Sequence, residues 1–156
     1  MQVSKIALVV ALGLSSAFAF AGEIKDSTIN ATNATNSTNA SYAWAVQNVG
    51  VASGNSGIYS SHINANGARN RADGYGSWAF QEIGTASNGG QLRNVTVNAT
   101  NASNRASAGY SYATQEIGKA IGTGSLMQNV TVNANGATNA ANGYGSWSQQ
   151  RVGVAQ

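Results

Sequence analysis

The side chains able to carry out acid–base, nucleophilic or metal chemistry are few in this 156-residue chain. Cysteine is absent, the single histidine is His62, and the acidic residues are Glu23, Asp26, Asp73, Glu82 and Glu116. None of them has the spacing of a metal site, a phosphate-binding loop or a catalytic triad. Glu82 and Glu116 occupy equivalent places in a repeated pattern, and we expect both to point outward into solvent, where general acid–base work is unfavourable. The sequence therefore predicts no catalytic, cofactor-binding or metal-binding residue.

Basic side chains offer a second kind of chemistry. Four arginines lie in the middle of the chain: Arg69, Arg71, Arg93 and Arg105. Together with exposed aromatic residues they could contact nucleic acid or polysaccharide. Isolated charges in a chain with only 8% charged residues also limit premature aggregation. We favour this second role, so no nucleic-acid partner is required.

The elements that would position these side chains come from an internal repeat. The motif Gln-x-[Val/Ile]-Gly-x-Ala occurs four times, with its glutamine at Gln47, Gln81, Gln115 and Gln150 and its glycine at Gly50, Gly84, Gly118 and Gly153. Each glutamine follows an aromatic residue by three positions (Trp44, Trp78, Tyr112, Trp147) and an asparagine by seventeen (Asn30, Asn64, Asn98, Asn133). The asparagines lie 34, 34 and 35 residues apart, and the extra residue falls between Gly118 and Asn133. A fixed period in this range is typical of a repeat architecture.

This period predicts the organisation of the chain. A leader covers residues 22–28, and four repeats follow at 29–57, 58–90, 91–124 and 125–156. Repeats two and four resemble each other more than their neighbours, since both contain Gly-Tyr-Gly-Ser-Trp. The structural unit is therefore either one repeat or a pair.

Alternation before each glycine predicts a strand. In repeat one, Ala43, Ala45, Gln47 and Val49 share one face, and the order small, small, Gln, β-branched recurs in every repeat. We expect this uniform face to be packed and the variable face to be exposed. A second strand is predicted around 95–99 and 130–134. Between the two strands Asn, Gly or Asp recurs at every third position, which we interpret as tight arcs because Asn and Gly tolerate left-handed conformations. A third short strand is the alternative.

Identical polar residues at a fixed period have a physical use in stacked strands. If successive repeats form rungs about 4.8 Å apart, each Gln or Asn amide can bond to the one above it, as in cross-β ladders. Tandem duplication followed by drift would also leave such residues. We favour the ladder, and so predict an all-β chain built as a repeat β-solenoid or cross-β stack of four repeats. Strands per rung, handedness and the direction in which the Asn ladders face stay open.

Composition and the first residues indicate export. Residues 1–21 contain a charged start at Lys5, an apolar run over 6–14 and a small-residue cleavage site at 19–21, which is typical of a secretory signal peptide. Cleavage at 17–19 is the alternative. The mature chain has neither cysteine nor proline, so it has no disulfides and no interrupter of a backbone ladder. We expect a secreted protein that is not inserted in a membrane.

The repeats resemble those of exported bacterial functional amyloids, the curli and Fap-type fibre subunits. Curlin repeats have Gln-x-Gly followed by Asn-x-Ala, whereas this chain has Gln-x-[Val/Ile]-Gly-x-Ala and Asn-x-Ala only at some positions. The period of about 34 residues is nearer the Fap-type length. The resemblance implies a soluble secreted monomer that assembles with itself, head to tail, into extracellular fibres of a biofilm matrix. It also implies a nucleating subunit and an outer-membrane secretion apparatus as partners.

Two functions are therefore predicted from the sequence. The first is a structural subunit that polymerises into an extracellular amyloid-like fibre at the cell surface. The alternative is a soluble monomeric β-solenoid that binds carbohydrate or ice through one flat face. Soluble solenoids need polar terminal caps, and repeat four ends at Gln156, shortly after Gly153. This feature favours the fibre.

Overall fold

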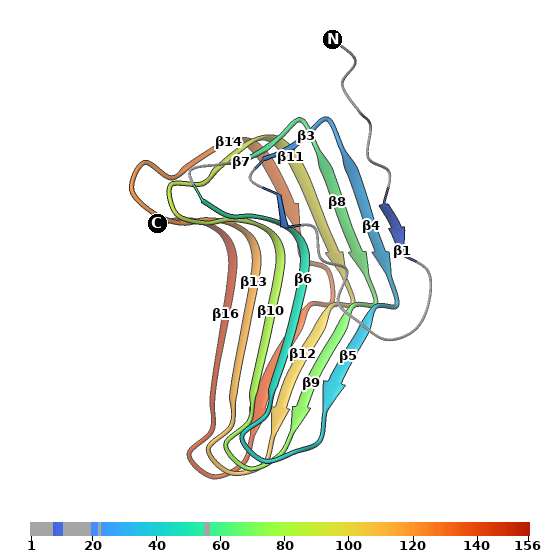
Figure 1. Ribbon diagram of the computed structural model, residues 1–156, viewed down its shortest axis with the longest axis vertical. Helices are drawn as coiled ribbons and strands as arrows, with labels where there is room; N and C mark the ends of the chain where they lie inside the picture. The colour runs from blue at the N-terminus through green and yellow to red at the C-terminus, as the bar shows by residue number, and fades with distance from the viewer. Residues whose placement is uncertain (1–7, 11–19, 22, 55–56) are drawn as a thin grey trace.

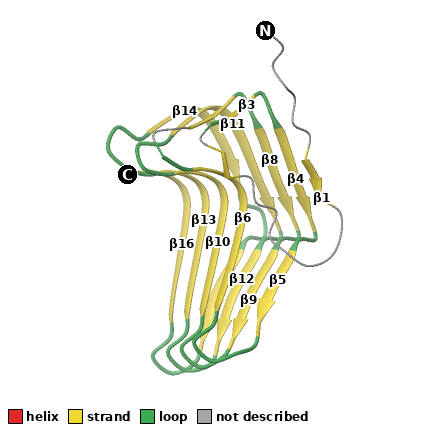
Figure 2. Ribbon diagram, in the orientation of Figure 1, coloured by secondary structure: helices red, strands yellow, loops and turns green. Residues whose placement is uncertain are grey.

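The computed structural model describes residues 8–10, 20–21, 23–54 and 57–156. Their regular secondary structure consists of strands stacked in parallel, which confirms the predicted β-solenoid (Figures 1 and 2). Within the described residues no helix is long and apolar enough to cross a membrane. Most of the predicted signal peptide lies outside these residues. Two short strands within it are described, β1 (Leu8–Val10) and β2 (Phe20–Ala21).

Each turn of the solenoid is one rung that passes through three sheets. Rung one contains β3 (Ile24–Lys25), β4 (Thr28–Thr32), β5 (Thr35–Thr38) and β6 (Trp44–Ala52). Rung two contains β7 (Gly57–Tyr59), β8 (His62–Asn66), β9 (Arg69–Asp73) and β10 (Trp78–Ala86). Rung three contains β11 (Gln91–Thr100), β12 (Ser103–Ser107) and β13 (Tyr112–Ala120). Rung four contains β14 (Leu126–Asn133), β15 (Thr138–Asn142) and β16 (Trp147–Ala155).

Strands from successive rungs pair in register to form the sheets. One sheet joins β4, β8, β11 and β14, with β3 and β7 in line and β1 against β4. A second joins β2, β6, β10, β13 and β16, and a third joins β5, β9, β12 and β15. Gln81 pairs with Gln47 and Gln115, and Gln115 pairs with Gln150. Ala120 pairs with Ala86, 34 residues away, and Leu126 pairs with Gln91, 35 residues away, so the extra residue lies between Ala120 and Leu126.

The tract with a polar residue at every third position forms a third strand in each rung. The interpretation as tight arcs is wrong for most of it, and the alternative of a short strand is confirmed. Only one position in each repeat makes the corner before this strand: Asn33, Gly67, Asn101 and Gly136, all with φ between 53° and 67°. The next residue in the three-residue series, such as Asn70, points into the core. The three-residue spacing therefore places a corner residue at one position and an inward-pointing side chain three residues later.

Two apolar clusters fill the interior. The larger contains the Ile, Val and Leu side chains between the first sheet and the ends of β6, β10 and β13, for example Ile63, Ile83 and Val97. The smaller consists of alanines, including Ala45, Ala79 and Ala113, where the second and third sheets converge (Figure 1). Small side chains suit this narrow arm because larger ones would force the sheets apart.

The motif glycine bends the long strand of each rung between the two clusters. Gly84 has a φ of 63°, which L-residues adopt at a cost. A Cβ atom placed on it would also lie 2.6 Å from Cγ2 of Val97. Backbone conformation and close packing therefore both require glycine at this elbow, which explains why it recurs in every repeat.

Candidate functional site

The motif glutamines form a buried ladder along the solenoid axis. The side-chain amide of each later glutamine donates to the one before it: Gln81 Nε2 to Gln47 Oε1 at 2.5 Å, Gln115 Nε2 to Gln81 Oε1 at 2.6 Å, and Gln150 Nε2 to Gln115 Oε1 at 2.5 Å. Gln47, Gln81 and Gln115 are fully buried. A buried amide costs free energy unless it is bonded, so each rung depends on its neighbour to satisfy this group.

A second buried ladder consists of asparagines that the sequence analysis did not single out as a ladder. Their side chains bond from rung to rung: Asn36 Nδ2 to Asn70 Oδ1 at 3.0 Å, Asn70 Nδ2 to Asn104 Oδ1 at 2.9 Å, and Asn104 Nδ2 to Asn139 Oδ1 at 2.8 Å. Each also donates to backbone carbonyls of the second sheet, as Asn70 does to Ala45 and Phe80. The sequence did contain a signal for this ladder, because each of its asparagines lies six residues after a member of the predicted Asn column.

The predicted Asn column lies on the outer face of the first sheet. Asn64 Nδ2 donates to Asn30 Oδ1 at 2.7 Å, and Asn98 and Asn133 continue the series at 2.8 Å. Asn30 and Asn133 are exposed and the two middle residues are partly covered. The question of which way the Asn ladders face therefore has two answers: one column faces solvent, and the other faces the core.

Aromatic side chains form two columns on the outside of the solenoid, one on the strands of the second sheet and one in the turns that precede these strands. Trp44 and Trp78 stack with centroids 5.1 Å apart and planes 4° apart, and Tyr112 and Trp147 extend the column with increasing tilt. A groove of about 300 Å³ beside them is lined mainly by apolar atoms of Trp44, Val46, Trp78, Phe80 and Tyr112. This column is the predicted aromatic ladder.

The second aromatic column was missed by the sequence analysis. Tyr42, Tyr75, Tyr110 and Tyr144 pack edge to face, with centroids 5.6–5.9 Å apart. In rungs one and three the tyrosine lies two residues before the first residue of the long strand, and in rungs two and four it lies three residues before it. Glycine (Gly76 and Gly145) then takes the place two residues before the strand in rungs two and four. A Cβ atom at Gly76 would lie 2.7 Å from the ring of Tyr42, and one at Gly145 would lie 2.7 Å from the ring of Tyr110. The alternation is therefore steric, and it makes two rungs the repeating unit of this column.

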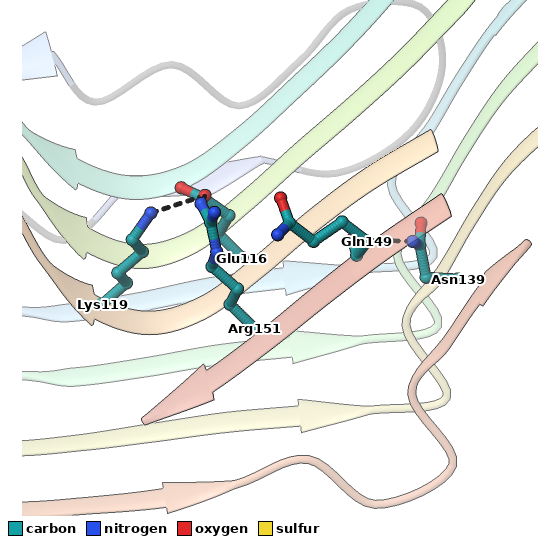
Figure 3. Close-up of polar contacts among 5 residues, drawn as sticks. All are labelled: Glu116, Lys119, Asn139, Gln149 and Arg151. Atoms are coloured by element: carbon teal, nitrogen blue, oxygen red, sulfur yellow. Dashed lines mark hydrogen bonds and ion pairs between the residues drawn. The ribbon is translucent and has the colours of Figure 1, made fainter. Parts of the chain in front are cut away.

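The positions after the glutamines lie at the elbow, where Glu116 is buried and Glu82 is only partly exposed, which corrects the expectation that both carboxyl groups are solvated. Glu116 is only 4% exposed and Lys119 only 2%. Glu116 Oε1 accepts from Lys119 Nζ at 2.7 Å and from Arg151 Nη1 at 2.9 Å (Figure 3). The strand bends at Gly118, between Glu116 and Lys119. The bend brings the side chain of Lys119 against that of Glu116, so each shields the other from solvent.

Burial also changes the chemistry of the other carboxyl group in this column. It raises the pKa of Glu82 to about 7, and the negative charge of Glu116 on the next rung acts in the same direction. Glu82 therefore gains or loses its proton near neutral pH. Glu116 has two cationic partners, whereas no cationic group among the described residues forms an ion pair with Glu82.

Rung four is the exposed end of the stack. No strand among the described residues pairs with the outer edges of β14, β15 or β16. The side chains that continue the core columns are open there: Val152 is 41% exposed and Gln150 is exposed, whereas Ile117 and Gln115 below them are fully buried. This end therefore presents unpaired backbone groups together with apolar and amide side chains arranged at the spacing of the core.

The fold and these ladders define a β-solenoid protein whose inner polar residues bond along the axis. The chain matches no protein-family model, no curated protein and no solved structure. Among the described residues no group of three or more His, Cys, Asp or Glu side chains is placed to hold a metal ion. The ladders repeat the same hydrogen bonds and packing along one axis, and at rung four their outer side has no partner among the described residues.

Proposed function

We propose that the protein is a secreted structural subunit that assembles with itself, end to end, into an extracellular amyloid-like fibre of a biofilm matrix, as its resemblance to curli and Fap-type subunits implies. The observation that carries the proposal is the open face of rung four. An unpaired strand edge is a template for another chain, and the edge of rung four carries side chains that continue the core columns. A second copy stacked on it would bury Val152 and Leu126 and extend every ladder.

The geometry of the contact supports a filament rather than a closed oligomer. Rung four of one copy and rung one of the next are different surfaces, so the contact is heterologous. Strands of successive rungs pair in parallel. A copy added in the same orientation therefore presents the same open face at its own rung four. Such growth has no natural stopping point.

The N-terminal end of the stack fits this proposal when the leader is removed. β1 pairs with the edge of β4, and β2 pairs with the edge of β6. Both strands lie in the predicted signal peptide. Cleavage during export would leave the edges of β4 and β6 free to accept another copy, so assembly would begin outside the cell.

The alternative function, binding of carbohydrate or ice through a flat face, is supported by the exposed aromatic column and its groove. Two features fit it less well. Trp44 and Trp78 cover each other's ring faces, and those faces are what a sugar ring would stack on. The outward column of Thr28, Thr96 and Thr131 is interrupted by His62, so this column is not the regular threonine row that would favour ice binding.

Electron microscopy and fibre diffraction of the mature chain, residues 22–156, test the proposal. We expect unbranched fibres that bind amyloid dyes and give a meridional reflection near 4.7 Å. A chain that stays monomeric for weeks at high concentration would contradict the proposal. Binding of that monomer to a polysaccharide or to ice would favour the alternative.

A further inference from the structure

We propose that the two buried amide ladders, which point in opposite directions, fix both the polarity and the register of the junction between copies. The partner on rung four is then rung one of a second copy, in the same register as neighbouring rungs within the chain. The inference rests on the proposed fibre and adds which ends meet and which residues face each other.

The glutamine ladder donates toward rung one. Every Gln side chain gives its Nε2 proton to the glutamine of the preceding rung. At the end of rung four, no donor among the described residues reaches Oε1 of Gln150. At the other end, Gln47 has no preceding glutamine. Its Nε2 donates to the carbonyl of Ala34 at 3.0 Å, as the later glutamines do to the equivalent alanines at 3.4 Å, and to the carbonyl of Arg69 on rung two at 3.2 Å, a bond that donation to a preceding copy would replace.

The inner asparagine ladder donates toward rung four. Asn36, Asn70 and Asn104 each give an Nδ2 proton to the asparagine of the following rung. Asn139 therefore ends the series with an Nδ2 group that has two backbone acceptors, Ala113 and Gln149 (Figure 3), whereas Asn104 has the two equivalent acceptors and a third. At the opposite end no donor among the described residues reaches Oδ1 of Asn36.

Backbone groups determine which atom of each inner asparagine amide is nitrogen. Nδ2 of Asn70 lies 2.8 Å from the carbonyl oxygen of Ala45 and 2.9 Å from that of Phe80. A flipped amide would place its oxygen against both carbonyls, so the donor direction follows from the backbone. Asn36 is fixed in the same way by the carbonyl of Val46 at 2.7 Å.

The two ends are consequently complementary to each other when rung one of a second copy stacks on rung four in register. Rung four presents an acceptor in the glutamine column and a donor in the asparagine column, whereas rung one presents a donor and an acceptor in the same columns. Head-to-tail stacking in register lets Gln47 of the next copy donate to Gln150, and lets Asn139 donate to Asn36 of the next copy. Two like ends meet only when one copy is turned over, so their strands would run antiparallel and the glutamine and asparagine columns would not continue in register.

Two outer columns agree with the same register. Tyrosine and glycine alternate from rung to rung, and rung four carries Gly145 where rung one carries Tyr42, so stacking rung one on rung four continues the alternation. On the elbow column, Arg151 would lie next to Asn48 of the next copy. Oδ1 of Asn48 is buried without a hydrogen-bond donor within the described part of the chain, and the guanidinium of Arg151 is one-third exposed.

Disulfide trapping in assembled fibres tests the inference, because the chain has no cysteine of its own. Thr28 and Thr131 lie in one outward column, are exposed and belong to rungs one and four. Two single variants, Thr28→Cys and Thr131→Cys, are mixed, assembled, oxidised and dissolved in denaturant. A pair in the neighbouring Asn column, Asn30→Cys with Asn133→Cys, provides a second readout of the same register.

We expect covalent heterodimers from each mixture and no homodimers from either variant alone. Thr32→Cys mixed with Thr131→Cys is the register control. Thr32 is exposed and on the same strand as Thr28, but about 13 Å along it, beyond the range that a disulfide spans. It should give at least about tenfold less heterodimer.

Each other outcome overturns a defined part of the reasoning. Homodimers from Thr131→Cys alone would mean that like ends meet, and the polarity would be wrong. Heterodimers formed better with Thr32→Cys than with Thr28→Cys would mean a shifted register. Fibres that give no cross-link at either column would mean that rung four does not stack on rung one. Absence of fibres from the parent chain would instead overturn the proposed function.

Discussion

Rungs three and four continue the same glutamine and β-branched columns, yet these columns are core in rung three and surface in rung four. Gln115 and Ile117 are fully buried, while Gln150 is exposed and Val152 is 41% exposed. Gln150 still bonds to Gln115 as Gln115 bonds to Gln81. The conformation of a rung is therefore set by the chain and by the preceding rung, whereas its burial depends on what stacks on the following side.

The largest expected difference between a covered rung and the open one is at the elbow glycine. Gly84 and Gly153 share a φ of 63°, but only Gly84 lacks room for a Cβ atom. We expect Gly84→Ala to lower the free energy of unfolding of the subunit by about 3 kcal/mol or more, from backbone strain plus overpacking. Gly153→Ala should cost about 1–2 kcal/mol, from backbone strain alone. Denaturant unfolding of the monomeric subunits measures both.

The same two variants distinguish an effect on the stability of the subunit from an effect on the growth of the fibre. A Cβ atom on Gly50 or Gly84 would meet the side chain of Ile63 or Val97 on the following rung, so in register Gly153 faces Ile29 of the next copy. Gly153→Ala should therefore slow seeded elongation far more than its small effect on the subunit implies. Equal elongation of Gly153→Ala and the parent chain would show that rung four stays uncovered.

The pH dependence of stability should follow Glu82. Its carboxyl group stays protonated up to about pH 7 in the folded subunit, compared with about 4.5 for an ordinary glutamate. Its contribution is therefore fully present below pH 4.5 and is lost as the pH rises through 7. At most roughly 3 kcal/mol is involved, and less to the extent that solvent reaches the group.

Glu82→Gln tests this dependence, because it removes the charge that forms beside Glu116. We expect the variant to be more stable than the parent above pH 7 and to lose most of the slope between pH 4.5 and 7. Unfolding curves across this range provide the measurement, with Glu23→Gln, an exposed site, as the control. A parental slope in Glu82→Gln would place the titrating group elsewhere.

The glutamine ladder predicts a smaller contrast between rungs three and four. Gln115→Leu leaves Oε1 of Gln81 and Nε2 of Gln150 without their partners, and should cost about 1–3 kcal/mol of subunit stability. Gln150→Leu leaves one atom, Oε1 of Gln115, without its partner instead of two, and should cost less. In fibres the order should reverse for elongation, because Gln150 is then the acceptor at each junction. Thermal unfolding and seeded growth of both variants check the two halves of this prediction.

Much of this architecture could be predicted from one sequence because a period fixes register. The spacing of Gln47, Gln81, Gln115 and Gln150 predicts which residues stack, and the observed strand pairs follow it. Alternation around the same glutamines identifies the packed face. Neither inference requires knowledge of how the chain turns between strands.

The features that were missed depend on the turns. The burial of Glu116 results from the bend at Gly118, and the inward direction of Asn70 results from the corner at Gly67. The sequence pattern shows that these residues recur, but it does not show the angle between successive strands. It therefore cannot show which side chains on an apparently outer face become buried at a bend. The tyrosine column was missed for a related reason. Its members alternate between two positions of the repeat, so they do not recur at one fixed spacing in the sequence.

The smallest expected effect concerns the charge at the junction. In the proposed register Arg151 meets Asn48 of the next copy, so Asn48→Arg places two like charges at every junction. Within the subunit the introduced guanidinium lies beside Glu82, its strand partner, which is an attractive contact. The side chain of Arg151 is one-third exposed, so solvent screens the repulsion to about 0–1 kcal/mol at each junction, but it recurs each time a copy is added. We expect slower seeded elongation at low salt, recovery toward the parent rate at high salt because of screening, and little change in subunit unfolding. Asn48→Gln, which adds length without charge, is the matched control and should show no salt-dependent defect. If Asn48→Arg grows like the parent at low salt, Arg151 and Asn48 do not meet, and rung four is covered in some other register.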